Sequence, residues 1–134
     1  MTTHKTYFID IDGTIVKHLN NNQLDEILKK MTHNYQFEEV LLPGVKRLWS
    51  TFHQDDKIVI TTARKEKHRA FTELIFERNG LRYDNLIMDL ASGPRILIND
   101  TPSILYEKAK AINVQRDKGF YFYDSDDDAS NSDD

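Results

Sequence analysis

Two aspartates separated by one residue follow an apolar stretch near the start of the chain. Residues 7–16 read Y-F-I-D-I-D-G-T-I-V, so Asp10 and Asp12 lie at the end of this stretch, just before Gly13. Side chains alternate along an extended chain, which places Asp10 and Asp12 on the same side. Two carboxylates at such short range repel, and one stays protonated unless a cation lies between them. The pair therefore predicts a cation site at the end of a buried strand.

Polar residues also follow two further apolar stretches. K-I-V-I-T-T ends in Thr61 and Thr62, and R-I-L-I-N-D ends in Asn99 and Asp100. In parallel sheets the carboxyl ends of the strands meet at one edge, and ligands bind beyond that edge. We therefore expect three strands to bring polar side chains to one place.

The residue types at this edge are those that phosphoryl transfer needs. Asp100 and the two N-terminal aspartates offer hard oxygen ligands, which suit Mg²⁺ better than zinc. One carboxylate can then attack a phosphoryl group and form an aspartyl phosphate. The other can donate a proton to the leaving oxygen and later take one from water. The phosphoryl oxygens need a hydroxyl and a cation, for which Thr62 and either Arg95 or Arg64 are candidates.

The pattern of apolar residues predicts the elements that position these side chains. Strands are expected at residues 6–11, 57–62, 85–90, 95–100 and 119–123. Helices are expected to begin at about Asn22 and just after Pro43, and to extend over residues 65–80, where Gly80 is the C-terminal cap, and over residues 103–112. Strands that alternate with helices indicate an α/β protein with a mainly parallel sheet covered on both faces. The expected fold is a three-layer α/β/α Rossmann-like sandwich. The short segments at 14–43 and 90–95 leave no room for a large cap domain.

The motifs resemble those of the haloacid dehalogenase (HAD) superfamily of aspartate-nucleophile phosphatases. D-I-D-G-T-I-V resembles the first motif, I-V-I-T-T-A-R looks like the second, and S-G-P-R-I-L-I-N-D looks like the third and fourth. The resemblance extends over about residues 6–103 in the family's order. It implies a Mg²⁺-dependent phosphomonoester hydrolase that acts through an aspartyl phosphate.

The resemblance also implies roles for the acidic residues. Asp10 would be the nucleophile and a Mg²⁺ ligand. Asp12 would be the general acid and base, with its backbone carbonyl on the metal, and Asp100 would be a further metal ligand. A dehalogenase has no alkoxide to protonate, so the second aspartate favours phosphoryl transfer.

Thr62 and Arg95 are the phosphate binders that the resemblance implies. Thr61 is the alternative hydroxyl, because alternation allows only one of the two threonines to face the site. T-x-R matches the usual ending of the second motif, which favours Thr62. Arg64 is the alternative cation.

A member without a large cap implies a bulky substrate or closure of the site by a neighbouring subunit. A phosphosugar in a homo-oligomeric enzyme, a nucleotide or nucleic-acid end, and a phosphoprotein all fit. The chain lacks the basic stripe with interleaved aromatic residues that is typical of nucleic-acid binding, so nucleic acid is possible but not favoured. Two alternatives remain open: a phosphotransferase or mutase with the same site, and a non-catalytic phosphate-binding module that acts through its tail.

Composition separates a folded domain from an acidic tail. Residues 1–123 form the expected phosphatase domain, and residues 124–134 contain six Asp and no Lys or Arg. Such a segment cannot bury enough apolar surface to order itself, so we expect a disordered tail that solubilises the protein or docks a basic partner. The chain has no cysteine. It also has no run long enough to span a membrane and no apolar signal region, so we expect a cytoplasmic protein.

Overall fold

The computed structural model describes residues 4–31 and 37–120. In chain order its elements are β1 (Thr6–Asp10), α1 (Asn21–Met31), α2 (Val45–Ser50), β2 (Lys57–Thr61), the 3-10 helix η1 (Glu66–His68), α3 (Arg69–Asn79) and β3 (Asn85–Ile87). The predicted tail at 124–134 and most of the predicted strand at 119–123 lie outside the described residues. None of the helices in the described ranges has the length and hydropathy that a membrane crossing needs.

The three strands form a parallel sheet in the order β1-β2-β3. β2 lies in the centre, and its connection to β3 runs through η1 and α3, which is the crossover that parallel neighbours require. The predicted α/β class with a parallel sheet is therefore confirmed. The predicted helix at 65–80 is present as η1 and α3, and Gly80 ends it with a left-handed φ of 65°.

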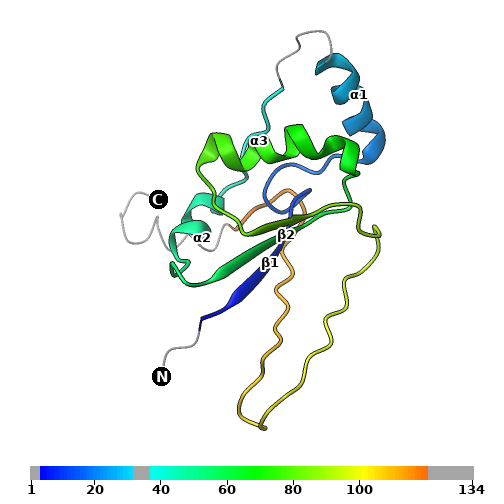
Figure 1. Cartoon of the computed structure of the whole chain (residues 1–134). Coiled ribbons are helices and arrows are strands. Elements are labelled where there is room, and N and C mark those ends of the chain that lie inside the picture. The colour runs from blue at the N-terminus through cyan, green and yellow to red at the C-terminus, as the bar shows by residue number, and fades with distance from the viewer. Residues whose placement is uncertain (1–3, 32–36, 121–134) are drawn as a thin grey trace.

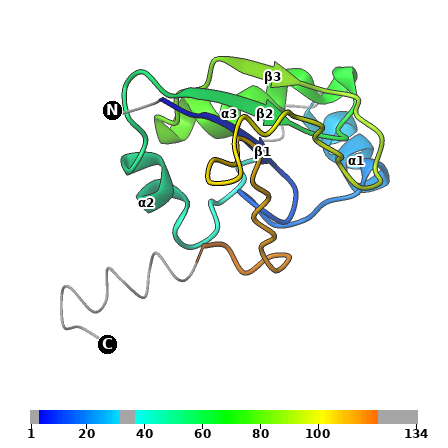
Figure 2. The ribbon, with the colours of Figure 1, turned by 90° about the horizontal axis from the view of Figure 1, so that it is seen from below.

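One face of the sheet forms the core. Ile9, Ile58 and Ile60 alternate with less buried residues and join the same buried cluster as Ile75 and Phe76 of α3. Figure 2 shows the three strands side by side with α3 running along one face. On the other face the side chains are more open, since Phe8 is 58% exposed and Ile87 is 43% exposed. The described residues thus form a sheet with one well-covered face, and the second helical layer of a three-layer sandwich is not seen among them.

The described structure has neither the strand predicted at 95–100 nor the helix predicted at 103–112, so both predictions are wrong. Residues 91–112 leave the sheet after β3 as a long excursion without a regular helix or strand (Figure 1). A strand exists only when a neighbour accepts and donates its hydrogen bonds, and within the described chain residues 95–100 pair with no strand. The apolar pattern at 96–98 is real, but the side chains face solvent, and Ile98 is 89% exposed. Ile104 and Leu105 in the segment at 103–112 are each 94% exposed, so in the described structure a helix there would lack the packing that a short helix needs.

A tight turn after β1 brings a distant segment to the strand's end. Gly13 has a φ of 83°, and its N–H donates to the Val16 carbonyl at 2.7 Å. Val16 then pairs with Leu41 in an antiparallel bridge, and the Leu42 N–H donates to the Ile15 carbonyl at 2.8 Å. The segment at 37–42 is thereby held beside the carboxyl end of β1.

Candidate active site

Asp10 is the last residue of β1, and its carboxylate is partly exposed and has two polar partners. Its Oδ2 accepts a hydrogen bond from the Thr14 hydroxyl at 3.0 Å, and its Oδ1 lies 3.4 Å from Nη2 of Arg95. Burial raises the pKa of Asp10, and the Thr14 hydrogen bond and the Arg95 charge oppose that rise. The side chain remains 38% exposed. Asp10 is therefore both held in place and open to a substrate.

Asp12 lies in the turn that follows and is paired with Arg64. Nε of Arg64 contacts Oδ2 of Asp12 at 3.0 Å, and Nη2 contacts Oδ1 at 2.8 Å. The other edge of the same guanidinium binds Glu39, with Nη2–Oε1 at 2.7 Å and Nη1–Oε2 at 2.9 Å. One arginine thus holds two carboxylates, each through two hydrogen bonds. Bidentate pairs of this kind are among the strongest that side chains form.

The cluster of Arg64, Asp12 and Glu39 is almost completely buried. The side chain of Arg64 is 0% exposed, and those of Asp12 and Glu39 are 13% and 5% exposed. Nη1 of Arg64 also donates to the Thr72 hydroxyl at 3.0 Å. Burial lowers the pKa of Arg64, but the hydrogen bonds to Glu39 and Asp12 outweigh burial and raise it overall. The five N–H groups of the guanidinium are all engaged, so Arg64 in this arrangement has no donor left for a phosphate.

The two threonines at the end of β2 have different surroundings. Thr61 is paired in register with Asp10, which places the two side chains on the same face of the sheet. Thr62 is buried just beyond β2, and its hydroxyl oxygen accepts the Arg64 N–H at 3.1 Å. The register therefore makes Thr61 the direct neighbour of Asp10, whereas Thr62 supports the loop that carries Arg64.

The structure brings Arg95 to the site but leaves Asp100 among exposed residues. The Arg95 side chain is 44% exposed and reaches Asp10 across 85 residues of sequence. Asp100 accepts a hydrogen bond from the Asn99 amide at 3.3 Å, whereas Asp10 and Asp12 bind Thr14, Arg95 and Arg64. Asp10, Asp12 and Arg95 thus lie together in the described chain. Asp100 does not join them, because the strand at 95–100 that would have carried it to the same edge of the sheet is absent.

The donors at the end of β1 fit part of a Mg²⁺ site. Both oxygens of the Asp12 carboxylate bind Arg64, so a Mg²⁺ ion would depend on the Asp12 backbone carbonyl that the resemblance assigns to it. Asp10 has a weak contact on Oδ1 and can offer that oxygen as well. Mg²⁺ needs only one or two protein oxygens when water and substrate phosphate supply the rest. Asp10 can offer one such oxygen, and the carboxylates of Asp12 and Asp100 do not add to it in the described structure.

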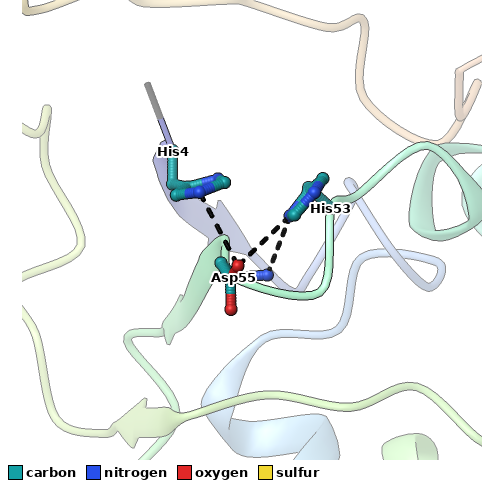
Figure 3. A group of neighbouring side chains, drawn as sticks. All are labelled: His4, His53 and Asp55. Carbon is teal, nitrogen blue, oxygen red and sulfur yellow. Dashed lines mark hydrogen bonds and ion pairs between the residues drawn. The ribbon is translucent and has the colours of Figure 1, made fainter. Parts of the chain in front are cut away.

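A different group of possible metal ligands lies at the opposite end of the sheet. His4, His53 and Asp55 offer ligand atoms that all lie within 4.8 Å of one another, and all three residues are exposed (Figure 3). Nδ1 of His53 already accepts the Asp55 N–H at 3.1 Å. Imidazole ligands suit zinc, copper or nickel better than Mg²⁺. This group is therefore separate from the Mg²⁺ site that the aspartates predict.

A surface hollow of about 630 Å³ lies near Glu39 but outside the site. Its lining comes from residues 38–42, from Gly44, Lys46 and Arg47 next to and within α2, and from Asn79. Since neither Asp10 nor Asp12 contributes to it, the chemistry described above does not take place in this hollow.

Comparisons with known proteins find no relative of this chain. The chain matches no protein-family model, and neither the curated proteins nor the solved structures include a detectable match. The resemblance to the HAD superfamily therefore rests on the sequence motifs alone.

The sequence did not identify three of the residues that surround the aspartates. Glu39 is separated from Arg64 by 25 residues, and Thr72 follows Arg64 by eight. Neither lies in a motif, so only the fold shows that they meet. Thr14 was visible as the threonine of D-x-D-G-T, but its hydrogen bond to Asp10 depends on the turn at Gly13.

Proposed function

We propose that the protein is a Mg²⁺-dependent phosphomonoester hydrolase that acts through an aspartyl phosphate on Asp10. The observation that supports this most is the pairing of two unlike carboxylates at the end of β1. Asp10 is partly exposed and lies beside the cation of Arg95, and Asp12, two residues on, is anchored by Arg64. Two neighbouring carboxylates, one of which is accessible for attack, are the groups that such a reaction needs.

The reaction proceeds in two displacements at phosphorus. A carboxylate oxygen of Asp10 attacks the phosphorus, and the bond from phosphorus to the leaving oxygen breaks. For this step the Asp12 carboxylate has to release Arg64 and carry a proton, which it donates to that oxygen, so an alcohol leaves and the aspartyl phosphate remains. Water then attacks the phosphorus, Asp12 takes the proton from the water, and inorganic phosphate leaves as the Asp10 carboxylate is restored. The reaction consumes one water and needs no oxidant or reductant.

Charge around the phosphoryl group comes from residues near Asp10. Arg95 is exposed and contacts Asp10 only at 3.4 Å, so its guanidinium can turn to a phosphoryl oxygen when a substrate arrives. The hydroxyl of Thr61, which is in register with Asp10, supplies a neutral donor next to it. Mg²⁺, bound by Asp10 and the carbonyl of Asp12, would neutralise further charge on the phosphoryl oxygens.

The site is open in the described structure, since the Asp10 side chain is 38% exposed. A large phosphorylated substrate can therefore reach Asp10 without a cap having to open. Phosphosugars, nucleotide or nucleic-acid ends and phosphoproteins all meet this condition, and the proposal does not select one of them.

Hydrolysis of 4-nitrophenyl phosphate tests the proposal. We expect turnover that needs Mg²⁺, that EDTA abolishes, and that Asp10→Asn reduces to background. Asp55→Asn is the matched control, because it removes an exposed carboxylate at the opposite end of the sheet and should leave turnover unchanged. Metal-replete Asp10→Asn protein that still hydrolyses the ester would rule out Asp10 as the nucleophile. A folded wild type with no activity on any phosphoester would instead support the non-catalytic module.

A further inference from the structure

We propose that Arg116 determines substrate specificity by binding a second anionic group, a carboxylate or a further phosphate, of a small phosphomonoester whose reacting phosphate lies at Asp10. The inference rests on the proposed phosphatase activity and deepens it, because it names a class of substrate. Among the substrates that can enter an open site, it favours those with a second acidic group close to the phosphate. Arg116 touches neither the phosphorus nor the leaving oxygen in this account.

The side chain of Arg116 crosses the turn that follows Asp12. A Cβ built on Gly13 would lie 3.0 Å from Cγ of Arg116 and 3.7 Å from its Nε. Gly13 thus takes a φ of 83° and also leaves the space that the Arg116 side chain occupies. His18 flanks the same space, because its own Cβ lies 3.6 Å from that added Cβ. Arg116 therefore lies against the backbone between Asp12 and Thr14.

This position is close to the proposed nucleophile. Thr14 follows Gly13 directly, and its hydroxyl donates to Oδ2 of Asp10 at 3.0 Å. Gly13 lies three residues after Asp10, so even a fully extended chain would separate their Cα atoms by no more than about 11 Å, and the turn shortens this. An arginine held at Gly13 can therefore contact a part of a small substrate that extends past Thr14.

The turn that carries Arg116 is fixed to the turn after β1. The Asp117 N–H donates to the Gly13 carbonyl at 2.9 Å, and Oδ1 of Asp117 accepts the His18 N–H at 2.7 Å. Asp117 has a φ of 65°, a left-handed conformation that residues other than glycine adopt only at a cost. Backbone strain of this kind is concentrated at functional sites. The two hydrogen bonds therefore hold Arg116 in a defined place beside Gly13.

The guanidinium of Arg116 is free to bind a ligand. Arg116 is exposed, and within the part of the chain that the structure describes it has no hydrogen-bond or ion-pair partner. The carboxylate next to it, that of Asp117, already accepts a backbone N–H. A guanidinium binds a carboxylate or a phosphate through two parallel hydrogen bonds, which favours an anion of either kind. Arg95 then serves the reacting phosphoryl group at Asp10, and Arg116 serves the second anion.

Competition against the hydrolysis of 4-nitrophenyl phosphate tests the inference. 3-Phosphoglycerate against glycerol 3-phosphate reports on a carboxylate, and fructose 1,6-bisphosphate against fructose 6-phosphate reports on a second phosphate. In the wild type we expect the more anionic member of at least one pair to compete about 10- to 100-fold better, as one charge-assisted hydrogen-bonded contact predicts. Arg116→Gln should remove this preference. It should leave KM for 4-nitrophenyl phosphate, which has no second anion, unchanged.

Lys118→Gln is the matched control, because it removes another exposed cation from the same turn and should leave the preference unchanged. Arg116→Lys keeps the charge but not the planar fork, so it should retain part of the preference. Added salt should weaken the preference of the wild type, a test that needs no variant. Thermal unfolding of each variant checks the fold.

The outcomes separate the inference from the proposed function. A wild type that does not hydrolyse 4-nitrophenyl phosphate overturns both. An active wild type with no preference in either pair, or an Arg116→Gln variant that keeps the preference, overturns the inference alone. The same loss in Lys118→Gln would show general attraction to a positive surface and would also overturn it. So would an Arg116→Gln variant whose KM for 4-nitrophenyl phosphate rises as much as its competition weakens, since Arg116 would then bind the reacting phosphate. Loss of the preference in Arg116→Gln alone supports the inference, and the pair that shows it identifies the second anion.

Discussion

Whether the apolar residues at 96–98 are buried can be measured by truncating two isoleucines and comparing the losses in free energy of unfolding. The structure buries Ile60 completely in the sheet core and leaves Ile98 89% exposed. The sequence predicted that both would lie in buried strands. Ile60→Ala and Ile98→Ala make the same chemical change, so the difference in their free energies of unfolding reports the difference in burial.

The magnitude follows from the exposed fractions. Ile→Ala removes three carbons, which at about 0.8 kcal/mol each gives about 2.4 kcal/mol for a buried side chain. The cavity left at Ile60 adds to this, for a total of about 2–5 kcal/mol. Only about a tenth of Ile98 is removed from water, so its truncation should cost about 0.3 kcal/mol on the same scale.

Urea unfolding followed by the fluorescence of Trp49 provides the assay. With an m-value of about 2 kcal/mol per M, Ile60→Ala should lower the midpoint by about 1–2.5 M and Ile98→Ala by about 0.15 M. Ile60→Val is the milder control and should cost about 1 kcal/mol. If Ile98→Ala destabilises as much as Ile60→Ala, residues 96–98 pack in the core, and the reasoning that leaves them outside the sheet is wrong.

Three further predictions concern backbone strain, acid stability and phosphate binding. Gly44→Ala should destabilise by clearly more than the roughly 1 kcal/mol expected for Gly80→Ala. Both glycines have positive φ, but a Cβ on Gly44 would lie 2.3 Å from a backbone carbonyl oxygen and one on Gly80 would meet nothing; equal losses in thermal unfolding would refute this. Hydrogen bonds from backbone N–H groups lower the pKa of Asp56, so its stabilisation is present above about pH 4 and is lost as the pH falls through the folded pKa. The stability gap between wild type and Asp56→Asn should therefore shrink on acidification, and a gap that is constant with pH would contradict this. Arg95→Ala should raise KM for 4-nitrophenyl phosphate by about tenfold, as expected for loss of one charge-assisted hydrogen bond, and an unchanged KM would remove Arg95 from the site.

The local parts of the fold were predictable because they depend on local pattern. The apolar runs of β1 and β2 and the Gly80 cap of α3 are encoded within a few neighbouring residues, and they form where expected. The strand at 95–100 shows the limit of this reasoning. Its R-I-L-I run has the composition of a strand, but a strand also needs a partner, and composition cannot tell whether an edge is available.

The acidic residues of the site could be predicted from the sequence, but the arginine that lies beside Asp10 could not. Asp10 and Asp12 lie together because they are two residues apart on one strand end, which sequence spacing specifies. Arg64 and Arg95 were both candidates for phosphate, and the sequence offered no means to separate them. The fold separates them through Glu39, whose carboxylate engages Arg64 and leaves Arg95 as the exposed cation beside Asp10. That contact spans 25 residues and depends on the bridge between Val16 and Leu41.

Trapping the phosphorylated protein tests the central claim most directly. Wild type and Asp12→Asn are mixed with 4-nitrophenyl phosphate and Mg²⁺, quenched in acid, digested and examined by mass spectrometry. The account predicts one added phosphoryl group on the peptide that contains Asp10. It should accumulate most in Asp12→Asn, because that variant can still expel nitrophenolate but cannot activate water. Turnover by the wild type with no phosphoryl group on Asp10 in either protein would contradict the account, since the phosphoryl group would then pass directly to water.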